Sequence, residues 1–132
     1  MFRDMGTVDA RLLNDVTSTA ETYFRPALAD GSYRAWLMEN EDGVVVGGGG
    51  LVIAAWPGYP GERQPRRAWI LNMYTEPAYR RQGIARRLME AMIEWCRAEG
   101  LSAVALHASE QGRPLYESLG FCPTNEMRLR FP

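Results

Sequence analysis

The sequence is poor in residues that build metal centres and disulfide frameworks: it has one histidine, His107, and two cysteines, Cys96 and Cys122. This set is too small for a zinc site made of clustered Cys and His ligands. Cys96 falls within a helical pattern and Cys122 follows a Gly-Phe pair, so both are expected to pack as small apolar groups. We therefore expect no metal site, no disulfide and a reducing, cytoplasmic location.

Neither sign of charge is in excess, since 15 basic and 16 acidic residues leave a net charge of −1. Such a balance predicts neither nucleic-acid binding nor attraction to an anionic membrane. The N-terminus lacks a basic segment followed by an apolar run, and no apolar stretch approaches membrane-spanning length. We expect no signal peptide, no membrane association and one domain over residues 1–132.

What the sequence does contain is an alternation of helix and strand patterns. Helices are predicted over about 10–28, 83–99 and 113–119, the last two each followed by a glycine. Strands are predicted over 33–38, 44–56, 68–75 and 103–106, with one or two more within 121–131. This order predicts an α/β fold with a mostly antiparallel front half and a strand–helix–strand crossover. Four glycines, Gly47 to Gly50, interrupt the second strand, and tight packing under a neighbouring helix is the favoured interpretation.

The turn between the strand 68–75 and the next helix predicts an anion-binding site. The first turn of a helix exposes unpaired backbone N–H groups and the positive end of the helix dipole. Gly83 would let the backbone approach a phosphate, and Ala85 is small enough to leave that approach open. Neither the Walker phosphate loop nor the dinucleotide-binding fingerprint is present. We favour phosphate binding over a solvated turn.

The segment 70–85 resembles the core motif of the GCN5-related N-acetyltransferase (GNAT) family, Arg/Gln-x-x-Gly-x-Gly/Ala at the head of a helix after a strand. Arg80, Gly83 and Ala85 fill its fixed positions. Downstream, 115–121 resembles a second signature of the family, a helix that bears a tyrosine and ends in Gly-Phe. The resemblance extends from about Tyr33 to the C-terminus and implies a mixed, mostly antiparallel sheet flanked by helices.

The resemblance implies transfer of an acetyl group from acetyl-CoA to a primary amine of a small molecule or peptide. The diphosphate would lie beside Arg80, on the backbone N–H groups of Arg81, Gln82, Gly83, Ile84 and Ala85. The pantetheine arm would run like an extra strand beside the backbone of Met73, Tyr74 and Thr75. In this family that strand diverges from its neighbour, which opens a slot for the thioester.

Tyr116 matches the tyrosine that often protonates the leaving thiolate in this family, a general-acid step. The alternative is a core aromatic residue at helical spacing. Ser109 occupies a position where the family often has an asparagine that holds the cofactor arm, and serine can still form a hydrogen bond. The backbone N–H of Met73 or Tyr74 would meet the oxyanion of the tetrahedral intermediate.

Two side chains are candidates for accepting the proton of the amine. Glu76 is the carboxylate nearest in sequence to the slot, although a cap or a solvated turn residue is the simpler interpretation. His107, at a predicted strand end, belongs to the residue type suited to proton transfer near neutral pH, and a structural role is equally open. The acceptor-binding candidates are Asn72, for which backbone pairing is the alternative, and Glu126 in the polar C-terminal segment.

The family usually begins with a strand, and this sequence shows none before the helix 10–28. The first six residues resemble the end of the helix that normally follows that strand. Either the true start lies upstream, or a strand from a partner subunit covers the exposed sheet edge. We expect a homo-oligomer, a dimer. The alternative function is a module that binds acyl-CoA without turnover, and the presence of Tyr116 favours the enzyme.

Overall fold

The chain is described by a computed structural model for residues 10–58 and 60–132, with side chains from Val16 onward. Helix α1 (Ala10–Asp30) leads into an antiparallel hairpin of β1 (Tyr33–Glu39) and β2 (Val45–Ala55). The turn between these strands is closed by Asn40, whose side-chain oxygen accepts the backbone N–H groups of Asp42 and Val44. The predicted helix 10–28 and the first two predicted strands are thereby confirmed.

The second half of the chain contains the predicted crossover. Strand β3 (Arg66–Thr75) is followed by the short 3-10 helix η2 (Pro77–Tyr79) and by helix α2 (Ile84–Ala98). Strand β4 (Val104–Leu106) and helix α3 (Arg113–Ser118) complete the regular structure of the described residues. Gly83 and Glu99 flank α2 as its caps, so the helix begins one residue later than predicted.

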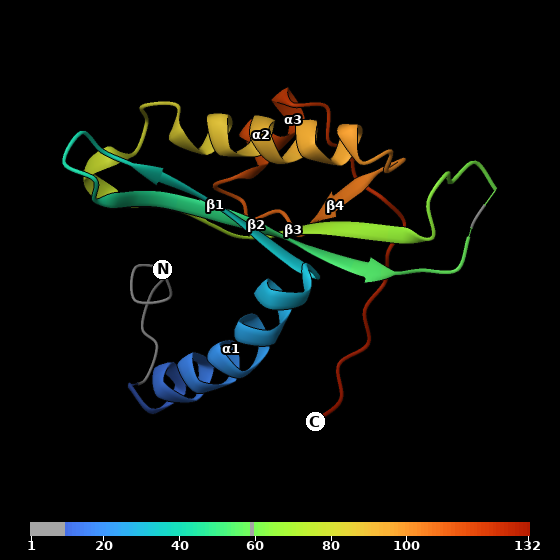
Figure 1. Ribbon diagram of the computed structural model, residues 1–132, viewed down its shortest axis with the longest axis horizontal. Helices are drawn as coiled ribbons and strands as arrows, with labels where there is room; N and C mark the ends of the chain where they lie inside the picture. The colour runs from blue at the N-terminus through green and yellow to red at the C-terminus, as the bar shows by residue number, and fades with distance from the viewer. Residues whose placement is uncertain (1–9, 59) are drawn as a thin grey trace.

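The four strands form one sheet in the order β1-β2-β3-β4, antiparallel except for the parallel pair β3 and β4. Helices α2 and α3 lie on one face, whereas α1 lies on the other face and packs near β1 (Figure 1). This arrangement confirms the predicted mixed, mostly antiparallel sheet flanked by helices. The interpretation of the first six residues falls outside the described residues.

The core lies between α2 and the sheet. Leu88, Met89, Met92 and Cys96 recur on one face of α2 and are buried. They pack against the buried strand residues Val46, Leu51, Ala68 and Ile70. Truncating one of the buried leucine, isoleucine or methionine side chains to alanine costs about 2–5 kcal/mol. The packing therefore holds the start of α2 firmly beside β3, where the anion-binding turn is predicted.

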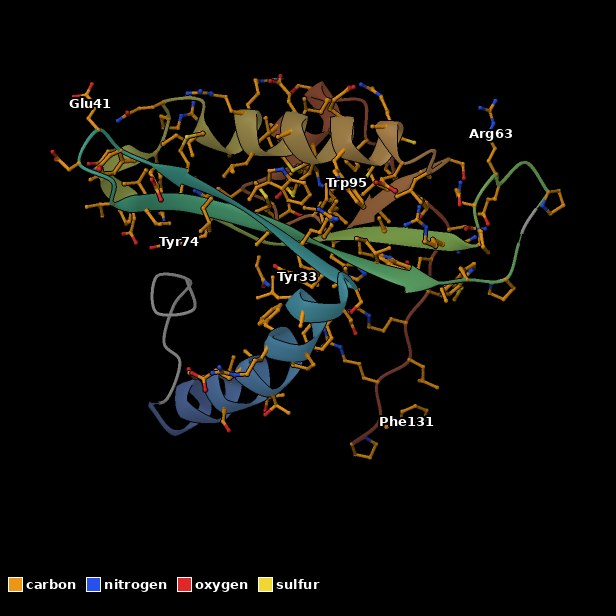
Figure 2. All side chains as sticks on the ribbon, viewed as in Figure 1. Tyr33, Glu41, Arg63, Tyr74, Trp95 and Phe131 are labelled. Carbon is orange, nitrogen blue, oxygen red and sulfur yellow. The ribbon has the colours of Figure 1, made fainter. Side chains whose placement is uncertain are left out.

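The glycines of β2 allow close packing on both faces of the sheet. A Cβ on Gly47 would lie 2.9 Å from Ile84 Cγ2 of α2, and one on Gly49 would lie 3.1 Å from Met92 Cε of the same helix. These two positions confirm the prediction of tight packing under a helix. On the opposite face, Gly50 makes room for the hydroxyl of Tyr33, which lies between the sheet and α1 (Figure 2).

The C-terminal segment differs from the prediction. No strand forms within 121–131, and residues 122–132 are exposed. Met127, Leu129 and Phe131 alternate with arginines, which is a strand pattern, yet their side chains are 94, 78 and 84% exposed. A strand needs a partner for its backbone N–H and C=O groups, and no strand of the described residues pairs with this segment. The prediction of one or two strands within 121–131 is therefore wrong.

Candidate functional site

The turn between η2 and α2 exposes consecutive backbone donors. Arg81 and Gly83 have φ angles of 63° and 80°, and left-handed residues in such a turn typically form concave anion-binding clusters of N–H groups. The N–H groups of 81–85 donate to no atom within residues 10–58 and 60–132. A Cβ on Gly83 would meet nothing within 4 Å, so the space beside the turn is open. Unpaired donors at the positive end of α2 fit a diphosphate.

Side chains brace this turn. Arg80 Nε donates to Thr75 O at 2.9 Å, and Arg80 Cζ lies 5.8 Å from the centroid of the Tyr74 ring. Gln82 Nε2 donates to Ala78 O at 3.4 Å. Because Arg80 is engaged with the end of β3, the anion-binding capacity of the turn rests mainly on its backbone donors.

Strands β3 and β4 diverge next to this turn. Their pairing begins at Ala68 and Val104 and ends at Ile70 and Leu106. Strand β3 continues for five residues beyond its last pairing with β4, and these residues include the predicted pantetheine-binding backbone of 73–75. The fork between the two strands is therefore next to the exposed donors of α2.

A β-bulge bends β3 within the fork. Gly48 pairs with Tyr74 and Gly50 with Leu71, so two residues of β3 lie opposite one residue of β2. Asn72, in the bulge, has a φ of 57°, and its Nδ2 donates to the hydroxyl of Tyr33 at 3.2 Å. Burial raises the pKa of Tyr33. The Asn72 amide thus braces β3 against β1 through a side-chain contact, where the sequence had suggested substrate or backbone as its partner.

Tyr116 is half-buried on α3, and its ring packs against the core and against Phe121. A Cβ on Gly112 would lie 2.7 Å from the Tyr116 hydroxyl oxygen, so the phenol lies directly over this glycine. Burial raises the pKa of Tyr116 above its ordinary value of 10.0. The phenol is therefore protonated at neutral pH, as a proton donor must be. It donates no hydrogen bond to any other described residue.

A polar contact holds α3 next to the start of α2. Arg86 Nη2 donates to Ser118 Oγ at 2.6 Å, and Ser118 Oγ donates to Leu115 O at 2.6 Å. Because Arg86 belongs to the first turn of α2, the contact holds the helix that bears Tyr116 beside the predicted anion-binding turn. Figure 1 shows the two helices on the same face of the sheet.

Two other predicted site residues have structural roles in the chain. Ser109 Oγ accepts the backbone N–H of Gly112 at 3.1 Å, and Ser109 O accepts that of Arg113, so Ser109 closes the turn before α3. Glu76 is exposed, and its backbone N–H donates to Val46 O at 2.8 Å. Its side chain does not cap η2.

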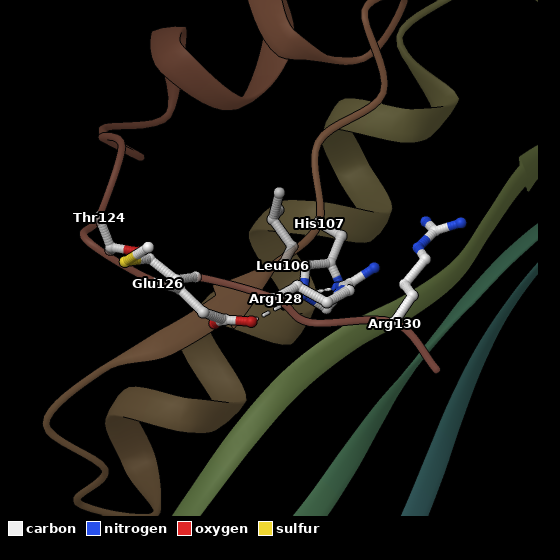
Figure 3. A pocket seen from close by; sticks show the side chains of 7 residues that line it. Leu106, His107, Thr124, Glu126, Arg128 and Arg130 are labelled. Carbon is white, nitrogen blue, oxygen red and sulfur yellow. Dashed lines mark hydrogen bonds and ion pairs between the residues drawn. The ribbon is translucent and has the colours of Figure 1, made fainter. Parts of the chain in front are cut away.

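A hollow at the end of β4 brings together two residues that are 19 positions apart, His107 and Glu126 (Figure 3). The hollow has a volume of about 560 Å³. Glu126 Oε1 lies 3.4 Å from His107 Nε2, and Arg128 Nη2 lies 3.0 Å from the same nitrogen. His107 directly follows Leu106, the last residue of β4 that pairs with β3, so the hollow lies at the C-terminal end of β4, between that strand and the C-terminal segment.

Arg128 and Arg130 line this hollow and were missed from the sequence. The available signal was the alternation of 126–131, in which Glu126, Arg128 and Arg130 share one side of an extended chain. Within the described parts of the chain, no group of three His, Cys, Asp or Glu side chains is placed to hold a metal ion. The same residues include no helix with the length and apolar character needed to cross a bilayer.

The parallel strands β3 and β4 diverge beside unpaired N–H donors at the start of α2. This combination is expected of the acyl-CoA-binding folds that the two sequence motifs resemble. Residues 7–121 match the profile of the Acetyltransferase (GNAT) family, and the chain belongs to this family. The match includes α1, which the motif resemblance did not cover.

The individual proteins that this chain resembles are also named as acetyltransferases. Human N-acetyltransferase 8 is 29% identical over 122 residues, 90% of this chain and 50% of that protein, so the chain spans about half the length of the curated relatives it matches. A crystal structure of a GCN5-related N-acetyltransferase from Ralstonia eutropha JMP134 is 38% identical with a TM-score of 0.87, covering 99% of this chain and 85% of that one. A predicted acetyltransferase from Clostridium acetobutylicum, crystallised with acetyl-CoA, is 27% identical with a TM-score of 0.81, covering 88% and 75%.

Proposed function

We propose that the chain is an N-acetyltransferase that transfers the acetyl group of acetyl-CoA to a primary amine. The observation that carries this proposal is the run of unpaired N–H groups at 81–85 beside the fork of β3 and β4. Family membership and the neighbour crystallised with acetyl-CoA support it. The cytoplasmic location, the single domain and the dimer remain predictions.

In the proposed complex, the backbone donors of 81–85 hold the diphosphate, because unpaired N–H groups at a helix start bind anions. The pantetheine arm pairs with the backbone of Met73, Tyr74 and Thr75, while Ser109 lies near the arm. Asn72 acts indirectly, since its hydrogen bond to Tyr33 supports the bulge that bends β3 at the fork.

Acetyl-CoA supplies an activated carbonyl, and the chain supplies the groups that stabilise the oxyanion and protonate the leaving sulfur. The nitrogen lone pair of the amine attacks the carbonyl carbon, and the backbone N–H of Met73 or Tyr74 stabilises the resulting oxyanion. As the C–S bond breaks, the Tyr116 hydroxyl donates its proton to the sulfur. His107, or Glu76 through water, accepts the proton lost by the amine. The products are an amide and the CoA thiol, and solvent reprotonates Tyr116.

The test is release of the CoA thiol across a panel of primary amines, with Tyr116→Phe as the decisive variant. Loss of the general acid is expected to lower kcat about 100-fold or more, with little change in KM for acetyl-CoA. Because burial raises the pKa of Tyr116 above its ordinary value of 10.0, loss of the acid's proton should lower wild-type kcat only above pH 10, where the phenolate forms. The Tyr116→Phe variant should not show this decrease of kcat above pH 10.

Tyr23→Phe is the matched control, since Tyr23 lies on the surface of α1 and should leave kcat unchanged. Full turnover in Tyr116→Phe at every pH would show that Tyr116 is not the acid. Tight acetyl-CoA binding without thiol release from any amine would identify the chain as a binding module instead. Exposed Cys122 contributes a thiol background, so the enzyme must be far below the substrate concentration.

A further inference from the structure

The histidine in the hollow at the end of β4 is contacted by two opposite charges through one nitrogen. Arg128 Nη2 can donate to His107 Nε2 only when that nitrogen carries no proton. Glu126 can accept from the same nitrogen only when it does carry one. One tautomer therefore leaves the carboxylate without this donor, and the other leaves the guanidinium without this acceptor. The cluster cannot satisfy both charges by itself.

A second positive charge lines the same hollow. Arg130 forms no hydrogen bond or ion pair with any described residue, and it lies on the far side of His107 from Glu126 (Figure 3). The hollow thus presents one carboxylate and two guanidinium groups around an imidazole. A ligand that carries both an ammonium and a carboxylate complements this set, because guanidinium groups bind carboxylates in charge-assisted pairs.

The position of the hollow connects it with the acyl transfer. His107 is the first residue after β4 stops pairing with β3, and the predicted thioester slot begins at the same level. Glu126 and Arg128 both lie within 3.4 Å of one imidazole nitrogen, so one small molecule can reach both. An amine held by Glu126 would then stand beside His107, the candidate proton acceptor.

We propose that this hollow is the acceptor site and that the acceptor is a small primary amine bearing a carboxylate, as in a free amino acid. Glu126 binds the ammonium, Arg128 and Arg130 bind the carboxylate, and His107 takes the proton when the amine attacks. This inference rests on the proposed acetyltransferase function and specifies its substrate class.

The experiment compares matched acceptors that differ only in the carboxylate. Alanine, leucine, phenylalanine and glutamate are each assayed beside their α-carboxamide and their α-decarboxylated amine. For an amino acid that fits the hollow, kcat/KM should be about 10- to 100-fold higher than for its α-carboxamide. This factor is the usual range for a hydrogen bond to a charged group. Binding of the same compounds to the CoA-saturated protein is measured by calorimetry, which does not depend on turnover.

Three substitutions test the individual roles. Arg128→Gln and Arg130→Gln should lower kcat/KM for the acids and leave the amides unchanged, so that the preference shrinks. Glu126→Gln should raise KM for acids and amides alike. Arg63→Gln is the control, because Arg63 projects into solvent from the loop before β3 (Figure 2).

The outcomes separate this inference from the proposed function. Turnover with no preference for the acids would overturn the inference and leave the acetyltransferase proposal standing. No turnover, together with calorimetric binding of acids but not amides, would support the site and contradict the enzyme. Equal binding of acids and amides in calorimetry, or a preference that survives both arginine substitutions, would also overturn the inference.

Discussion

At the scale of single residues, two glycines determine where two tyrosine hydroxyls lie. Gly50 gives room to Tyr33 beneath the sheet, and Gly112 gives room to Tyr116 beside the anion-binding turn. The sequence offered Tyr116 as either an acid or a core aromatic residue, and its ring does pack against the core. Gly112 was not predicted, although residues four apart at the start of a helix lie close together, so the spacing of Gly112 and Tyr116 was a local signal for this contact.

Replacing Gly112 with alanine is expected to impair turnover without removing any proposed catalytic group. The added Cβ would lie 2.7 Å from the Tyr116 hydroxyl, so the phenol must move. A misplaced acid should lower kcat at least about tenfold, since displacements near 1 Å cost enzymes as much as 100-fold. Steady-state kinetics measure this, with circular dichroism to verify folding.

The control for this substitution is Gly58→Ala, because a Cβ there would meet nothing within 4 Å. It should leave kcat unchanged. If Gly112→Ala is as active as Gly58→Ala, the position of the phenol does not limit the reaction.

At the scale of elements, locally coded features were predictable from the residues themselves, whereas the fork was expected only from the family resemblance. Helix α2 was predicted to within one residue at each end, because its apolar spacing and the flanking Gly83 and Gly100 are local signals. The turn 80–85, which we propose binds the diphosphate, belongs to the same stretch of chain. The bulge in β3 lies in a strand that is apolar at nearly every residue, so periodicity could not reveal it. Asn72 was the one hint, since asparagine tolerates positive φ angles.

Substitutions at Asn72 should separate its backbone conformation from its side chain. Asn72→Val places a β-branched residue at a φ of 57° and removes the hydrogen bond to Tyr33, so it should lower the free energy of unfolding by about 1–3 kcal/mol. Asn72→Gly removes the same hydrogen bond and tolerates the φ angle. Chemical denaturation and equilibrium binding of acetyl-CoA measure both variants.

If the bulge shapes the fork, Asn72→Val should weaken acetyl-CoA binding and Asn72→Gly should retain it. Equal affinities in the two variants would mean that the left-handed conformation of Asn72 does not shape the cofactor site. Tyr33→Phe isolates the hydrogen bond, because it keeps the ring and leaves position 72 unchanged.

At the scale of the whole molecule, residues far apart in the chain were placed together only by the fold. His107 and Glu126 were separate candidates in the sequence, and they meet because the C-terminal segment passes the end of β4. The same segment contradicted the prediction of final strands, because a strand depends on a partner that its own sequence does not contain. Strand pairing depends on the assembled sheet. The alternation of charged and apolar residues could therefore indicate that one side of 126–130 is charged, but it could not show whether this segment forms a strand.

Acetyl-CoA should stabilise the folded chain through contacts from β3, α2 and the intervening turn at once. A ligand at 100 times its dissociation constant adds about 2.7 kcal/mol to the free energy of unfolding. For a chain of this length that increment corresponds to a melting temperature about 10 °C higher. Differential scanning fluorimetry measures the shift, and acetyl-pantetheine, which lacks the diphosphate, provides the matched ligand.

Gly83→Ala should weaken the stabilisation by acetyl-CoA but not that by acetyl-pantetheine. Its φ of 80° disfavours alanine, and the added methyl group narrows the approach to the backbone donors of 81–85. The variant's own melting temperature is expected to fall modestly, so the comparison uses the increment caused by each ligand. An acetyl-CoA increment equal to that of the wild type would place the diphosphate elsewhere. A loss of both increments would instead mean that the variant has disturbed the fork, since acetyl-pantetheine requires only β3 and the slot.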